Sequence, residues 1–182
     1  MKPGMARLAA LVLVGLAFLG LAPTAQAMTP EAFLSGVYSR YGLAPDPRLA
    51  KDDQVFSEGL LGLQHRAEAL REKRLRRTPD LDPIEPIVLC RCQDWDETAY
   101  RIVRVETRPG PTGLTARLRV RLAPSGAPLT VFLRLTPAGD GWRIADLADP
   151  RPDGQPGEWL TDTLRTAITA DEAALRRRPV RP

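Results

Sequence analysis

The apolar residues of this chain are spaced as in helices over its first half and alternate as in strands over its second half. Phe33, Val37 and Tyr41 recur every fourth residue and predict a first helix. We expect this helix to begin at Thr29, which is suited to an N-cap and precedes a proline, and to end at Gly42.

A second helix is predicted to start after Asp52 or Asp53, because apolar residues again recur three and four positions apart. Its expected buried stripe consists of Phe56, Leu60, Leu63, Ala67 and Leu70. The last turns are strongly basic, which suits the negative end of a helix dipole and a solvated helix end. Three prolines between residues 79 and 86 then predict an irregular crossing.

Alternating apolar and polar residues predict four strands, at residues 98–107, 114–122, 128–136 and 142–147. Three short connections rich in glycine and proline separate these four strands, so we expect an antiparallel meander. A final amphipathic helix is predicted from Trp159 onwards. The fold class is therefore α+β, with helices on the Leu and Val face of the sheet and Arg117, Arg119 and Arg121 on its outer face.

Residues 1–27 have the pattern of a secretory signal peptide. Lys2 and Arg7 precede an apolar run at residues 8–21, and Ala25-Gln26-Ala27 offers small residues for cleavage after Ala27. The run is shorter than the roughly 20 residues that span a bilayer, so no stable membrane anchor is expected after cleavage. These features predict a periplasmic or secreted protein.

Residues 28–178 are expected to form a single domain, followed by a disordered tail at residues 179–182. The net charge of the whole chain is +4, and Lys2 and Arg7 supply two of these charges. The remaining excess is small, so we expect no nucleic-acid partner.

Three short motifs resemble the DUF3828 family of small exported bacterial proteins. They are Asp82-Pro83, then Cys90-x-Cys92-Gln93-Asp94-Trp95, then Gly141-Trp142-Arg143-Ile144-Ala145-Asp146. The resemblance implies an NTF2-like or cystatin-like cone, in which N-terminal helices pack on a curved four-stranded meander. It implies no catalytic residues. The chain departs from the family by a longer stretch between Asp82-Pro83 and Gln93-Asp94.

Cys90 and Cys92 lie two residues apart in a chain expected to reach an oxidising compartment. In an extended strand their α-carbons would be about 6.5–7 Å apart, at the upper edge of disulfide geometry. Three interpretations stay open: a local disulfide, two buried inert thiols, or a metal or redox site. A closed zinc site needs four ligands, whereas the chain offers these two cysteines and His65. We therefore expect no metal and no cofactor.

The candidate ligand-binding residues are Gln93, Asp94, Trp95 and Asp146. An amide and a carboxylate at the rim of a pocket would orient a polar ligand. The competing interpretation is that Gln93 and Asp94 form hydrogen bonds with backbone groups where the loop turns into the strand, and that Asp146 pairs with a nearby arginine.

No catalytic constellation is recognisable. A single histidine leaves little for a hydrolase triad, and no glycine-rich phosphate loop occurs. The outward arginines would suit an acidic partner or anionic lipid headgroups, or would simply form a solvated face that guards the sheet edge.

We therefore expect a non-enzymatic module that binds a small apolar ligand or an envelope protein, for example as an inhibitor or immunity protein. The alternatives are an enzyme with a polar pocket around Gln93, Asp94 and Asp146, and a structural envelope protein.

Overall fold

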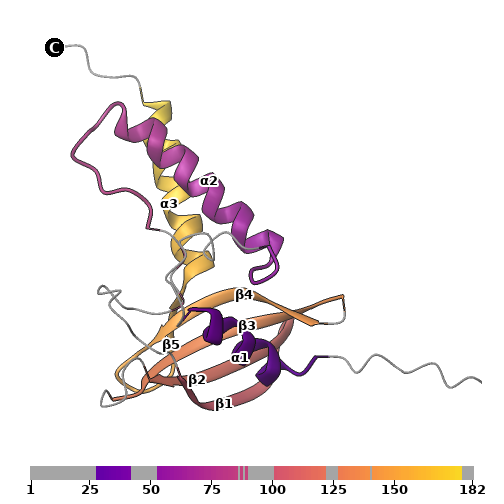
Figure 1. The fold of residues 1–182 in the computed structure, drawn as a ribbon. Helices are drawn as coiled ribbons and strands as arrows, with labels where there is room; N and C mark the ends of the chain where they lie inside the picture. The colour runs from indigo at the N-terminus through magenta and orange to yellow at the C-terminus, as the bar shows by residue number, and fades with distance from the viewer. Residues whose placement is uncertain are drawn as a thin grey trace, which may run out of the picture.

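The computed structural model describes residues 28–41, 53–85, 87, 89, 101–121, 127–139 and 141–177. Within these residues the protein is α+β, with three helices and one open antiparallel sheet of five strands (Figure 1). The elements, in chain order, are α1 (Pro30–Tyr41), α2 (Glu58–Leu75), β1 (Arg101–Gly110), β2 (Gly113–Arg121), β3 (Leu129–Ala138), β4 (Gly141–Pro150), β5 (Pro156–Trp159) and α3 (Leu160–Arg176).

The predicted meander is confirmed, because β1 to β4 pair antiparallel in chain order. The prediction of four strands is wrong by one, since β5 adds to the outer edge of β4. A tight turn at residues 151–155, where Gly154 has a φ of +76°, folds the chain back to make this strand. Trp159 accordingly ends β5, and the predicted start of the last helix at Trp159 is wrong by one residue.

A second segment covers the other half of the β4 edge. Ser57 donates its backbone N–H to the carbonyl of Ile144 at 2.9 Å, and Ile144 donates to the carbonyl of Val55 at 2.8 Å. This parallel bridge holds Phe56 beside Ile144, and Ser57 is extended, so the prediction that α2 starts after Asp52 or Asp53 is wrong. The helix begins at Glu58, where Ser57 caps it by accepting a hydrogen bond from Leu60 N at 3.2 Å.

The predicted core face is confirmed. Thr29 caps α1 through a hydrogen bond from Ala32 N at 3.1 Å, and the apolar face of α1 is buried against the sheet. The shared core includes Phe33, Leu34, Val37 and Tyr38 of α1 together with Ala116, Leu118, Val120, Leu133, Leu135 and Ile144 of the strands. Burial of this apolar surface is the main favourable term for the sheet half of the molecule.

Helices α2 and α3 both leave the sheet at β4 and run away from it side by side (Figure 1). Leu164 and Ile168 of α3 are buried with Leu60 and Ala67 of α2, which continues the core beyond the sheet. At the far end, Asp171 of α3 is fully buried and accepts hydrogen bonds from Arg71 Nε at 2.8 Å and Arg74 Nη1 at 2.7 Å. Burial alone would raise the pKa of Asp171, but the hydrogen bonds and charges of the two arginines hold that pKa below its ordinary value of 3.8.

We expect Gly113→Ala to lower the free energy of unfolding by about 2–3 kcal/mol, a cost typical of overpacking. A β-carbon at Gly113 would overlap the carbonyl oxygen of Leu135 on the neighbouring strand, whereas a β-carbon at Gly36 would meet open space. Gly36→Ala is the matched control and should stabilise its helix by about 0.5–1 kcal/mol. Urea denaturation measures both, and equal effects of the two changes would contradict the assignment.

The Asp171 cluster should make the stability depend on acid pH. The unfolded chain protonates Asp171 at a higher pH than the folded protein does, so the stabilisation is present above pH 3.8 and is lost as the pH falls through the lower, folded-state pKa. The difference in unfolding free energy between wild type and Asp171→Asn should therefore shrink as the pH is lowered from about 7 to about 3. Asp80→Asn, which alters an exposed acid, is the control and should show no such trend.

Candidate functional site

Of the candidate ligand-binding residues, Asp146 lies in the described part of the chain. Gln93, Asp94 and Trp95 lie outside the described residues, as do Cys90 and Cys92 and the leader at residues 1–27. Their predicted roles therefore stay predictions.

Asp146 is a buried carboxylate on β4, with 2 % of its surface exposed. Its Oδ1 accepts hydrogen bonds from the backbone N–H groups of Leu147 and Thr161, each at 3.0 Å. Its Oδ2 accepts from the Thr161 hydroxyl at 2.6 Å and from Arg134 Nη1 at 3.0 Å. Each oxygen thus accepts two hydrogen bonds from the protein itself, as a buried charge requires.

Register explains the pairing with arginine. Arg134 on β3 lies directly opposite Asp146, and a bulge immediately beyond this pair shifts the strands. The guanidinium of Arg134 also lies over the indole of Trp159, 3.8 Å from the ring centroid. The Asp146 cluster, defined as Asp146, Arg134, Trp159 and Thr161, therefore joins β3, β4, β5 and the first turn of α3.

Sequence reasoning predicted an arginine partner for Asp146 as one of two interpretations, and this pairing is confirmed. It missed Trp159, which it placed in the last helix, and Thr161, to which it gave no role. The available signal was the turn-rich segment before them, since a tight turn returns the chain to the strand that it has just left.

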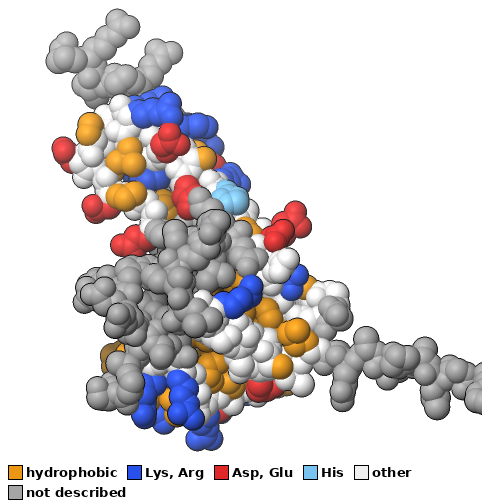
Figure 2. All heavy atoms as spheres, viewed as in Figure 1, with side chains coloured by type: hydrophobic (Ala, Val, Ile, Leu, Met, Phe, Trp, Pro, Cys, Tyr) orange, Lys and Arg blue, Asp and Glu red, His pale blue; other side chains and the backbone are white. Residues whose placement is uncertain are grey.

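A groove of about 540 Å³ lies between α1 and the start of β4. It is lined by Met28, Ala32, Phe33, Gly36, Val37, Arg40, Gln54, Gly141, Trp142 and Arg143. Figure 2 shows hydrophobic side chains over this part of the molecule, with Lys or Arg side chains among them. Its volume falls in the range of small-molecule sites.

Trp142 and Arg143 are held in place at this groove by backbone carbonyls. Trp142 Nε1 donates to the carbonyl of Met28 at 2.8 Å. Arg143 donates from Nε to the carbonyl of Asp53 at 2.8 Å and from Nη1 to that of Trp142 at 2.9 Å. Carbonyl groups carry no net charge, so these contacts orient the guanidinium without neutralising it, and no carboxylate of the described residues forms an ion pair with it.

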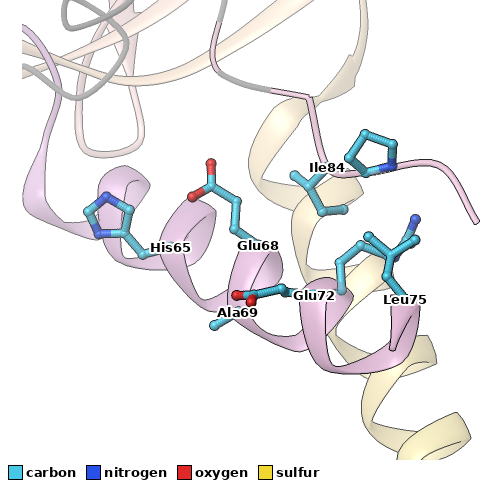
Figure 3. A pocket seen from close by; sticks show the side chains of 8 residues that line it. His65, Glu68, Ala69, Glu72, Leu75 and Ile84 are labelled. Atoms are coloured by element: carbon cyan, nitrogen blue, oxygen red, sulfur yellow. The ribbon is translucent and has the colours of Figure 1, made fainter. Parts of the chain in front are cut away.

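A second hollow, of about 390 Å³, lies between α2 and the segment that follows it. Figure 3 shows His65, Glu68, Ala69, Glu72 and Leu75 along α2, with Ile84 across from them. Internal contacts engage its charged groups, because Glu68 accepts from Gln64, Glu72 accepts from Arg76, and Arg71 binds Asp171. No group of three or more potential metal-ligating side chains occurs among the described residues.

Within the described part of the chain, no helix combines the length and the hydrophobicity that a membrane crossing requires. No family model, curated protein or solved structure matches this chain. The fold and these hollows define an α+β protein with an open antiparallel sheet, and the resemblance to the DUF3828 family stays a prediction.

We expect Asp146→Asn to destabilise the protein by about 3 kcal/mol. The change removes the buried negative charge that pairs with Arg134. It also replaces one carboxylate oxygen, a hydrogen-bond acceptor, by an amide NH₂ group that would face the N–H and O–H donors around it. Guanidinium chloride denaturation measures this change. Asp162→Asn, at an exposed acid in the same helical turn as Thr161, should cost less than about 0.5 kcal/mol. An Asp146→Asn protein as stable as wild type would show that the carboxylate is not a structural group.

Proposed function

We propose that this protein is an exported, non-enzymatic binding module that holds a small amphipathic ligand in the groove between α1 and β4. The observation that carries the proposal is the composition of that groove, which combines an apolar wall with an oriented guanidinium that has no ion-pair partner in the described part of the chain. Such a site favours a ligand with an apolar body and an anionic end.

The apolar wall comes from Phe33, Val37 and Trp142, and Gly36 lowers the helix surface beside them. A glycine here leaves room for a ligand against the helix backbone. Arg143 lies at the same groove, so an acid group would bind it while the body of the ligand covers the aromatic ring.

Export and the cone architecture belong to the same proposal. Cleavage after Ala27 would make Met28 the first residue, and its carbonyl is anchored by Trp142 at the groove. An open antiparallel sheet with α1 across its apolar face is compatible with an NTF2-like cone, in which a ligand enters between helix and sheet.

The enzyme alternative gains no support from Asp146. All four hydrogen bonds of its carboxylate come from groups that join strands and helix, so a substrate would have to displace a structural contact. A binding role for the groove needs no such displacement.

We expect Gly36→Phe to fill the groove and to weaken binding of decanoate, used as the probe, by about tenfold or more. Gly62→Phe is the matched control, because Gly62 is also an exposed helical glycine with open space around it, but lies on α2. Isothermal titration calorimetry measures both, and decanol should bind less tightly than decanoate to the wild type. Equal binding by wild type and Gly36→Phe would contradict the proposal.

Native mass spectrometry of the protein recovered from the periplasm tests export and natural occupancy together. The expected spectrum shows a chain without residues 1–27 and an added mass that is lost on denaturation. A retained leader would contradict export, and a bare chain that also fails to bind decanoate would contradict the amphipathic ligand.

A further inference from the structure

The outer face of β1 and β2 places like charges opposite one another. Arg104 on β1 pairs in register with Arg119 on β2, next to a bulge in β1 between Ile102 and Arg104. Like charges directly across two strands are destabilising. This arrangement therefore calls for a physical explanation.

Protection of the sheet edge explains only part of this arrangement of arginines. Charged side chains and bulges on an edge strand discourage pairing with other chains, and β1 is the edge strand among the described residues. Arg117 and Arg119 lie on β2, which is paired on both sides by β1 and β3. An interior strand has no edge to protect, so these two arginines need another explanation.

The side chains of these strands form a hollow of about 130 Å³, lined by Arg104, Glu106, Arg117 and Arg119. Glu106 is shared, with Arg104 Nε at 2.8 Å from one carboxylate oxygen and Arg117 Nη1 at 3.9 Å from the other. Arg119 forms no ion pair with a described carboxylate. Three guanidinium groups thus face one carboxylate on an exposed surface.

Arg117 also lies near an aromatic ring. Its guanidinium lies 5.9 Å from the centroid of the Phe132 ring, and Phe132 is itself 6 % exposed. Arg101 and Arg108, both exposed on the same strand as Arg104, extend the positive field along the edge. A preorganised guanidinium loses less entropy on binding an anion than a freely moving one.

We propose that this hollow, the β1–β2 arginine hollow, binds a phosphate group. Guanidinium groups match phosphate oxygens in pairs, and the volume accommodates one tetrahedral oxyanion. Glu106 lies between Arg104 and Arg117 and competes with the anion for them. The hollow lies on the opposite face of the sheet from the groove along α1, so this inference does not rest on the proposed ligand of that groove.

The test is titration of the ¹⁵N-labelled full chain with inorganic phosphate at constant ionic strength, followed by NMR of the arginine side chains. Arg119→Gln should weaken phosphate binding about fivefold or more. Arg165→Gln, which removes the same charge from an exposed position on α3, should change the affinity less than about twofold. Equal effects of the two changes would overturn the proposal, because they would show a response to net charge alone.

Glu106→Gln should change the affinity for phosphate in the opposite direction. It removes the competing carboxylate and frees two guanidinium groups, so it should tighten phosphate binding about threefold or more. Unchanged or weaker binding by Glu106→Gln would overturn the proposed geometry even if Arg119→Gln behaved as expected. Gly36→Phe should bind phosphate as the wild type does, which separates failure of this site from failure of the groove.

A sedimentation assay distinguishes the source of the phosphate. Vesicles of phosphatidylglycerol and phosphatidylcholine are compared with vesicles of phosphatidylcholine alone, for the wild type and for Arg119→Gln. Binding to the anionic vesicles that requires Arg119 and is blocked by inorganic phosphate assigns the site to lipid headgroups. Phosphate binding without vesicle binding assigns it to soluble phosphate esters, and the absence of both refutes the phosphate site.

Discussion

Pairing along both halves of the outer edge of β4 is the constraint on which the rest of the fold depends. Residues 55–57 bond to Ile144 at one half, and β5 pairs with residues 148–150 at the other. Helix α2 follows the first of these segments directly and α3 follows the second. The two long helices therefore both begin beside β4, and they run away from the sheet side by side because they begin at the same strand.

Two buried carboxylates stabilise this arrangement at opposite ends of α3. Asp146 accepts a hydrogen bond from Thr161 in the first turn of the helix. Asp171, near the other end of the helix, accepts hydrogen bonds from Arg71 and Arg74 of α2. Each acid forms an ion pair with arginine from a different segment of the chain. This pairing compensates the carboxylate for the water that it loses on burial. Such pairs stabilise one relative placement of the elements, because a shifted helix would leave a buried charge alone.

The meander separates two kinds of surface. Side chains alternate across each strand, so the apolar residues that meet α1 and the arginines of β2 lie on opposite faces of one sheet. The groove and the β1–β2 arginine hollow are consequently independent in position, and different strands build them, β4 with α1 for the groove and β1 with β2 for the hollow. An amphipathic ligand on one face and a phosphate group on the other are compatible in a single small protein.

Local pattern was sufficient to predict the α+β class, the meander, its inward and outward faces, and the cap at Thr29, because alternation and capping depend on neighbours in the chain. Tertiary structure decided what pairs at long range. The start of α2 at Glu58 depends on a bridge to Ile144, which has no signal in its own segment, whereas the turn-rich residues before β5 do indicate a return to β4. Asp146 could be named from the sequence, but only the register of β3 against β4 brings Arg134 to it and the return of β5 brings Trp159.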